Sequence, residues 1–265
     1  MKKLTGLILL IAAAAGLWLL VSGEPRGIVD EAVFRLGRNP AGTTRAAAEA
    51  EEIRRILEDT ETYPENLRRA LSENPELLPF ARDWGKEDMA EGKADLYLYE
   101  SLQKCPLFLQ WDRRWGYLSY GNSCVGLCGC GPTALSMVIY SLTRDQGALP
   151  GILARKAMEE GYYASGEGTS WLFMRDAAGD FGVEAEAGWM SEEKMRTVLE
   201  EGGLIILSVG PGDFTSQGHF IVVRACDERG FYVNDPNRRS TSCREDPWTY
   251  RELSSQALQM WNYRI

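Results

Sequence analysis

The chain has 265 residues, 45% of them hydrophobic and 25% charged, which is enough to bury the core of one large or two small domains. Its formal net charge of −9 at pH 7 argues against nucleic acid or anionic lipid as a partner. Cys124, Cys128 and Cys130 lie close together, but no second pair of zinc ligands follows them. We therefore expect no nucleic-acid partner, no metal and no other cofactor.

Residues 1–23 have the pattern of an export segment. Lys2 and Lys3 precede an uncharged apolar run from Leu4 to Val21, which favours a cytoplasmic N-terminus and an exported remainder. The run is long for a cleaved signal peptide and borderline for a membrane span, which needs about 20 residues. A signal peptide, a membrane anchor and a buried helix all remain open. The first two predict an extracytoplasmic protein, either secreted or anchored to the cell membrane.

The next part of the chain changes from linker to helix. Residues 24–43 contain several Pro and Gly residues and are expected to form a linker. Residues 44–100 are expected to form a helical N-terminal segment. Its first helix covers 44–58, and two more begin near Tyr63-Pro64 and Asn74-Pro75, where Pro stands at a helix start.

Residues 101–265 are expected to form the main domain. Its central helix should begin at Pro132 and run to about Leu142, because this stretch is apolar almost all round. The order of helices first and strands later predicts an α+β fold with an antiparallel sheet. The other elements expected are helices over 151–160, Ser170 to Gly182, Ser191 to Gly202 and 250–261, and strands over 204–209, 220–225 and 231–233.

Cys130 directly precedes this central helix. Unpaired N–H groups at a helix start favour negative charge, and a thiol attacks only as its thiolate, so the position suits a nucleophile. Gly129 and Gly131 would let the backbone of a substrate approach closely. The ordinary alternative is a small buried hydrophobic side chain. If Cys130 is the nucleophile it must stay reduced, and at most two disulfides can form among the other five cysteines.

His219 is the only histidine of the chain, so any imidazole base must be this residue. It follows a loop with several glycines and opens an apolar strand, which would hold a base at the mouth of a site. A hydrogen-bonded core histidine is the ordinary alternative.

Asp235 follows the next strand, where Pro236 ends the ladder. A hairpin centred on Asp227 would place His219 and Asp235 directly opposite one another. The turn signal is centred slightly later, so a bulge or a diagonal contact is needed to bring them together. An Asx turn before Pro236 is the ordinary alternative for Asp235. Cys, His and Asp in this order are typical of a thiol-nucleophile hydrolase.

Gln110 is a candidate for oxyanion stabilisation. Its amide N–H could donate to the developing oxyanion together with the backbone N–H of Cys130. A surface glutamine is the ordinary alternative.

From about Pro106 to the C-terminus, the chain resembles the bacteriocin-processing-peptidase-like branch of the papain-like cysteine peptidases. More closely, it resembles the stand-alone, exported members from Gram-positive bacteria. The resemblance implies a central helix packed on an antiparallel sheet, with Cys130 as nucleophile, His219 as base, Asp235 as orienting residue and Gln110 as oxyanion donor. The matching stretches are Leu109 to Gly116, Gly129 to Ala134, Gly210 to Gly212, Gly218 to Val223 and Val233 to Asn237.

These observations predict an exported or membrane-anchored cysteine peptidase that cleaves a peptide or protein substrate through an acyl-enzyme. Two alternatives remain open. The same thiol could serve an amidase or transpeptidase that acts on cell-wall peptide, or the domain could bind peptides without catalysis.

Overall fold

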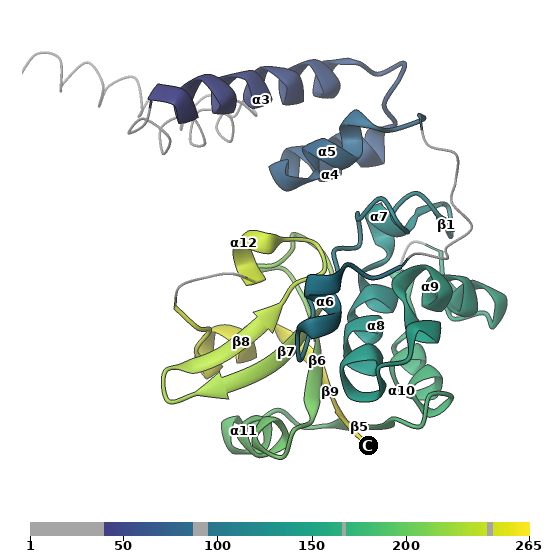
Figure 1. Cartoon of the computed structure of the whole chain (residues 1–265), viewed down its shortest axis with the longest axis vertical. Coiled ribbons are helices and arrows are strands. Elements are labelled where there is room, and N and C mark those ends of the chain that lie inside the picture. The colour runs from purple at the N-terminus through teal and green to yellow at the C-terminus, as the bar shows by residue number, and fades with distance from the viewer. Residues whose placement is uncertain (1–39, 87–94, 166–167, 243–245) are drawn as a thin grey trace, which may run out of the picture. The chain divides into compact units, whose positions relative to one another are not determined.

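The computed structural model describes residues 40–86, 95–165, 168–242 and 246–265 (Figure 1). The expected export segment and residues 24–39 of the expected linker lie outside this part of the chain. None of the helices within the described residues is long and apolar enough to cross a membrane. The chain divides into two compact units, Met1–Leu78 and Pro79–Ile265.

The first unit contains the helices α3 (Pro40–Glu58) and α4 (Glu65–Glu73) and the 3-10 turn η1 (Pro75–Leu77). Helix α3 begins at Pro40, so helix occupies the last four positions expected for the linker. The helix starts expected near Pro64 and Pro75 are confirmed. The side chain of Asn74 caps η1 by accepting a hydrogen bond from the backbone N–H of Glu76.

The second unit begins within α5 (Leu78–Arg82) and contains most of the described chain. Its helix starts follow the sequence: Ser170 and Ser191 each cap the next helix by accepting a backbone N–H. The further helices are α6 (Leu98–Leu102), α7 (Val125–Cys128), α8 (Cys130–Thr143), η2 (Gln146–Ala148), α9 (Pro150–Glu159), α10 (Trp171–Gly179), α11 (Glu192–Glu200), α12 (Arg239–Ser242) and α13 (Tyr250–Ser254).

A five-stranded antiparallel sheet forms the centre of this unit, in the order β5-β9-β6-β7-β8. Its strands are β5 (Glu184–Gly188), β6 (Leu204–Val209), β7 (His219–Asp227), β8 (Gly230–Asn234) and β9 (Ala257–Arg264). Two short hairpins lie outside this sheet, β1 (Ser119–Tyr120) with β2 (Ser123–Cys124), and β3 (Tyr163–Ala164) with β4 (Gly168–Thr169).

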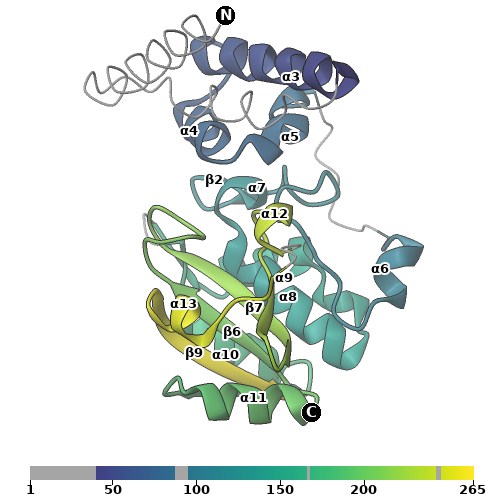
Figure 2. The same cartoon turned by 90° about the vertical axis from the view of Figure 1, so that its left-hand side faces the viewer.

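The central strand β6 is buried on both faces of the sheet, whereas the edge strand β5 is largely exposed. Helices α8, α9 and α10 lie on one side of it (Figure 1), and α13 lies on the other (Figure 2). Strand β6 is buried at all six positions, and its residues alternate between the two cores: Ile206 packs with the α8 side, and Ile205 and Leu207 pack with the other. The expected strand over 204–209 is therefore confirmed, and so is the α+β arrangement with α8 as a buried central helix.

The helix expected over 250–261 is wrong. Helix α13 ends at Ser254, and the chain then forms β9, which pairs with β5 along one edge and β6 along the other. Buried Met260, Trp261 and Tyr263 belong to this strand. Two rows of backbone hydrogen bonds outweigh the weak helical preference of this segment, and aromatic residues suit a strand that is packed on both faces.

Candidate active site

Cys130 is the first residue of α8, whose N-cap is Gly129. The helix begins two residues before the expected start at Pro132, so the cysteine occupies its first turn. The Cys130 side chain is partly buried. The central helix thereby holds this thiol at a fixed position beside the unpaired N–H groups of its start.

The glycines that flank Cys130 are explained by packing within the protein. A Cβ atom on Gly131 would lie 2.5 Å from the hydroxyl oxygen of Thr169. A Cβ atom on Gly129 would lie 2.6 Å from the carbonyl oxygen of Val125. Packing alone therefore requires glycine at both positions, and the close approach of a substrate expected from the sequence stays a prediction.

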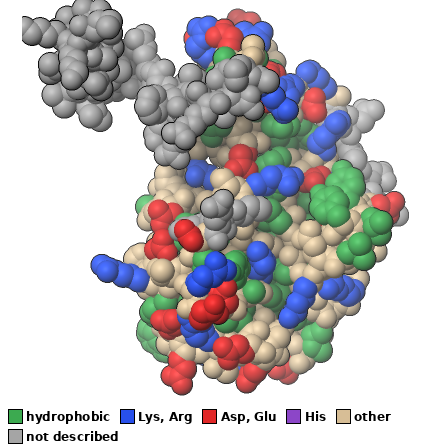
Figure 3. Space-filling model, turned by 60° about the vertical axis from the view of Figure 1, so that its left-hand side comes forward, with side chains coloured by type: hydrophobic (Ala, Val, Ile, Leu, Met, Phe, Trp, Pro, Cys, Tyr) green, Lys and Arg blue, Asp and Glu red, His purple; other side chains and the backbone are tan. Residues whose placement is uncertain are grey.

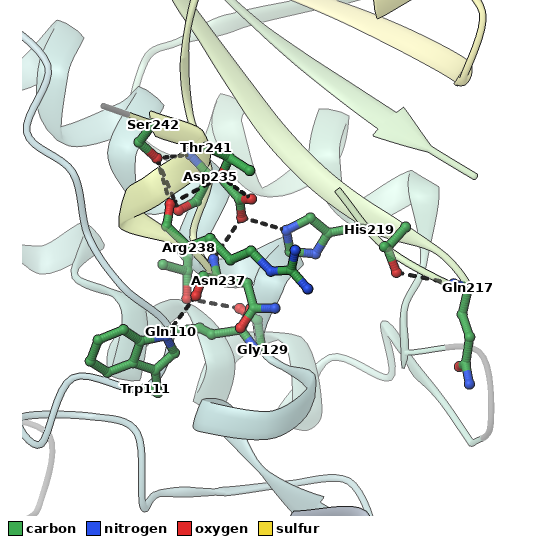
Figure 4. Close-up of polar contacts among 12 residues, drawn as sticks. Gln110, Trp111, Gly129, Gln217, His219, Asp235, Asn237, Arg238, Thr241 and Ser242 are labelled. Atoms are coloured by element: carbon green, nitrogen blue, oxygen red, sulfur yellow. Dashed lines mark hydrogen bonds and ion pairs between the residues drawn. The ribbon is translucent and has the colours of Figure 1, made fainter. Parts of the chain in front are cut away.

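His219 is the first residue of β7 and pairs with Val209 at the end of β6. Its side chain is almost completely buried, with an exposed fraction of 7%. The ring atom Nε2 lies 2.8 Å from Oδ1 of Asp235, and the thiol of Cys130 is near enough to the same ring to raise its pKa. The structure thus brings together the three residues that the sequence singled out, each from a separate element. Figure 4 shows the His219 ring beside the Asp235 carboxylate.

A β-bulge sets the register between β7 and β8. Near the turn, Ala225 pairs with Tyr232, but further along Val223 pairs with Val233. Arg224 is therefore an extra residue on β7 with no counterpart on β8.

Because of the bulge, Asp235 lies on the same face of the sheet as His219. Asn234 pairs with Val222, so the next residue, Asp235, continues opposite Ile221. Without the extra residue, Asp235 would continue opposite Val222, whose side chain points to the other face of β7. Because Ile221 and His219 share one face, the carboxylate reaches the ring diagonally. The bulge and the diagonal contact expected from the sequence are both present.

Asp235 has no exposed surface, and its carboxylate is held by several donors. Oδ1 accepts from His219 and, at 2.7 Å, from the backbone N–H of Asn237. Oδ2 accepts from the hydroxyl of Thr241 at 2.6 Å. The bond to Asn237 is the Asx turn considered from the sequence, so Asp235 forms the turn and contacts the histidine at once.

Burial and charge act in opposite directions on His219. Burial alone lowers the pKa of the imidazole, but the adjacent Asp235 carboxylate and the Cys130 thiol outweigh it and raise the pKa to about 10. Burial raises the pKa of Asp235, but the charge and hydrogen bond of His219 and the Thr241 hydroxyl hold it below its usual value. The ring is thus cationic, and the carboxylate ionised, at neutral pH.

Gln110 lies in the segment between α6 and β1 and is buried, with an exposed fraction of 4%. Its amide Nε2 donates to the carbonyl of Gly126 at 3.0 Å, in the short helix that directly precedes Cys130. This contradicts the alternative of a surface glutamine. It places the amide against the segment that leads into the nucleophile candidate.

The other four thiols in the described chain are stabilised in their neutral form by burial. Burial raises the pKa of Cys124 to about 11 and that of Cys128 to about 12. Burial also raises the pKa values of Cys105 and Cys226. All five cysteines in the described residues, including Cys130, are free thiols, and Cys243 lies outside this part of the chain.

Sequence reasoning missed the residues of α12 that surround Asp235. Ser242 accepts from the backbone N–H of Asp235 at 2.7 Å, and Thr241 binds its carboxylate. Trp111 Nε1 donates to the carbonyl of Asn237 at 2.7 Å. Thr241 and Ser242 follow Asp235 by six and seven residues. This spacing matches no helix or strand period, so the sequence did not indicate the contact.

The comparisons with known proteins identify the family of this chain. The model of the Peptidase_C39 like family matches residues 102–263, a range that holds all four candidate residues. The chain belongs to this family of cysteine peptidases. This family match confirms the expected resemblance to the bacteriocin-processing branch, and the helices and antiparallel sheet described above agree with the expected papain-like α+β fold. A comparison with curated proteins found no match.

Several solved structures resemble this C39-like peptidase in fold alone. A C39-like peptidase from Bacillus anthracis has 16% identity and a TM-score of 0.39, over 65% of this chain and 98% of its own. The peptidase domain of Streptococcus ComA, a bi-functional ABC transporter, has 19% identity and a TM-score of 0.37, over 51% and 89%. A double glycine motif protease from an AMS/PCAT transporter, solved with the leader peptide, has 19% identity and a TM-score of 0.35, over 51% and 84%.

Proposed function

We propose that this chain is an exported peptidase that cleaves peptide bonds with Cys130 as nucleophile, His219 as acid and base, and Asp235 as orienting residue. The observation that carries the proposal is the position of one buried imidazole between a thiol and a carboxylate. The Cys130 thiol is near enough to His219 to raise its pKa, the ring lies 2.8 Å from Asp235, and the chain has no other histidine. A thiol, an imidazole and a third group in mutual contact form the arrangement that activates a nucleophile.

The reaction follows from these contacts. The raised pKa of His219 favours an imidazolium, which stabilises a thiolate at Cys130 before substrate arrives. The thiolate attacks the peptide carbonyl, and His219 gives its proton to the leaving amine as the C–N bond breaks. Water then attacks the resulting thioester while His219 accepts a proton from it. The acid product leaves, and Cys130 and His219 return to their starting forms.

Gln110 supplies the proposed oxyanion donor. One N–H of its amide is used by the carbonyl of Gly126, which fixes the plane of the side chain. We assign the second N–H to the oxygen that becomes negative when the thiolate attacks, alongside the backbone N–H of Cys130.

Cleavage of a peptide library tests the activity. The wild type should release defined products and Cys130→Ala should release none. Cys128→Ala should behave as the wild type, because the Cys128 thiol is only partly buried like Cys130 but donates to the backbone carbonyl of Cys124 and not to the candidate site. Equal cleavage by Cys130→Ala would refute the assignment. Adding an amine acceptor or muropeptides to the same assay separates the alternatives. Transfer to the amine would indicate a transpeptidase, cleavage of muropeptides an amidase, and peptide binding without turnover a binding domain.

Export rests on the positively flanked apolar run of residues 4–21. We expect the chain to reach the outer side of the membrane, with this run either cleaved or retained as an anchor. A fusion of residues 24–265 should be soluble, folded and active, because the run precedes the expected linker. Cell fractionation of the full chain, with the N-terminal residue determined by mass spectrometry, separates cleavage from anchoring. Recovery of the full chain in the cytoplasm would contradict export.

A further inference from the structure

The carboxylate of Asp235 is held on both of its oxygens. Oδ1 contacts the His219 ring and the backbone N–H of Asn237, and Oδ2 accepts from the Thr241 hydroxyl at 2.6 Å (Figure 4). A distance of 2.6 Å is typical of a strong O–H···O⁻ bond to a charged acceptor. Thr241 is thus the partner of the oxygen that His219 leaves unused.

The short helix α12 carries this hydroxyl and is itself fixed to Asp235. The Ser242 hydroxyl accepts from the backbone N–H of Asp235 at 2.7 Å and donates to the carbonyl of Arg238 at 2.8 Å. Trp248 Nε1 donates to the carbonyl of Thr241 at 3.3 Å. One turn of helix therefore holds both the backbone and the carboxylate of Asp235, and fixes the two parts relative to one another.

The Asp235 carboxylate needs a hydrogen-bond donor on its second oxygen, Oδ2. The terminal torsion of an aspartate is broad, so a carboxylate held through one oxygen can turn away from the ring. A buried charged oxygen without a donor is also costly. A hydroxyl on Oδ2 meets both demands, since it fixes the rotation and stabilises the negative charge that faces the imidazolium.

We infer that Thr241 is a positioning residue for the reaction: it holds the Asp235 carboxylate in the plane and charge state that keep His219 oriented and protonated. This inference rests on the proposed roles of Cys130, His219 and Asp235. Thr241 does not touch the reacting atoms, and its effect passes through Asp235. Loss of the hydroxyl should therefore change the ionisation of the single histidine as well as the rate.

Kinetics of the full-length protein test the hydroxyl. Thr241→Val keeps the shape of the side chain and removes the donor, and kcat/KM should fall about tenfold, as for the loss of one charge-assisted hydrogen bond. Thr241→Ser keeps the donor and should recover most of the rate, and Thr241→Ala should not. Thr197→Val is the matched control, since the Thr197 hydroxyl binds the Glu193 carbonyl on exposed α11. If Thr241→Val does not fold, the pair Thr241→Ser and Thr241→Ala still separates the hydroxyl from the methyl group.

The second readout is the ionisation of His219, whose ring signal in an NMR titration needs no assignment because the chain has one histidine. The wild-type midpoint should lie near pH 10, and in Thr241→Val it should fall by about one pH unit, since a weaker carboxylate field stabilises the imidazolium less. Thr241→Ser should restore it. A merely structural role for Thr241 would lower the amount of folded protein and leave this midpoint unchanged.

The outcomes distinguish this inference from the proposed function. If Cys130→Ala or His219→Ala keeps the wild-type rate, the proposed function is wrong. If both are inactive while Thr241→Val keeps the wild-type rate and the wild-type titration midpoint, the proposed function stands and the positioning role is refuted.

Discussion

The backbone N–H of Gln110 donates to the carbonyl oxygen of Pro236 over 2.7 Å. Pro236 directly follows Asp235, so this bond joins the candidate oxyanion donor to the turn that holds the orienting carboxylate. A second bond runs beside it, from Trp111 Nε1 to the carbonyl of Asn237. Segments more than 120 residues apart in the sequence are thus tied together at the site.

Gln110→Ala should lower kcat with little change in KM, because an oxyanion donor binds the transition state more strongly than the substrate. Loss of one such donor costs roughly 10²-fold to 10³-fold in kcat. Steady-state kinetics on a peptide from the library screen measure this. The backbone bond to Pro236 survives the substitution, so circular dichroism should show an unchanged fold. A rise in KM at constant kcat would mean that Gln110 binds substrate and takes no part in stabilising the oxyanion.

His219 and Asp235 should differ in how far their replacement lowers the rate. His219→Ala removes both base and proton donor, a loss of order 10³-fold or more. Asp235→Asn should cost about tenfold, because an amide oxygen still accepts from the ring and the amide N–H can donate to the Thr241 hydroxyl oxygen. Asp235→Ala should fall between the two. Equal inactivity of Asp235→Asn and His219→Ala would show that the full negative charge is essential and that a neutral hydrogen-bond acceptor cannot replace it.

The stability of the protein should depend on the ionisation of His219. Its folded-state pKa of about 10 lies above the ordinary 6.5, so the His219–Asp235 contribution is complete below about pH 6.5 and is lost as the pH rises through about 10. In urea unfolding, wild type should lose more free energy between neutral pH and about pH 10 than His219→Gln. The other alkaline groups are common to both proteins and cancel in the difference. Parallel losses in the two proteins would contradict the raised pKa.

The thiols at Cys105, Cys124, Cys128, Cys130 and Cys226 should all be reduced in the active protein, as they are in the structure. Peptide mapping without reduction, after alkylation of the native and then the denatured protein, checks each one. This agrees with the limit of at most two disulfides drawn from the sequence. A bridge that includes Cys130 in active protein would exclude it as nucleophile.

Local chemistry made much of the fold predictable. The six-residue apolar run of β6, the serine caps at Ser170 and Ser191 and the nearly all-apolar α8 each carry their signal within a few residues. Strand β5 was missed because Glu184–Gly188 contains no β-branched or aromatic residue and pairs along one edge alone, with β9. The C-terminal strand was misread for a related reason, since its partners are distant in sequence.

In the candidate site, too, the residues with a local signal were predictable and those that depend on distant contacts were not. Cys130, His219 and Asp235 were visible from residue type, order and the helix and strand starts beside them. The hairpin predicts either a bulge or a diagonal contact. The position of the extra residue, Arg224, depends on the pairing on both sides of it and has no signal in the sequence. Thr241 was not visible at all, because its contact with Asp235 depends on where α12 folds back after the Asp-Pro-Asn turn.

Alkylation of the native protein at mildly acid pH, without any substrate, tests the central claim most directly. Iodoacetamide should modify Cys130 first, ahead of Cys124 and Cys128, because the His219 imidazolium and the start of α8 stabilise its thiolate. His219→Ala should abolish this preference. Peptide mass spectrometry measures the extent of modification at each thiol over time. Modification of Cys130 in denaturant alone, or at the same rate in His219→Ala, would show that the thiol and the imidazole do not act together.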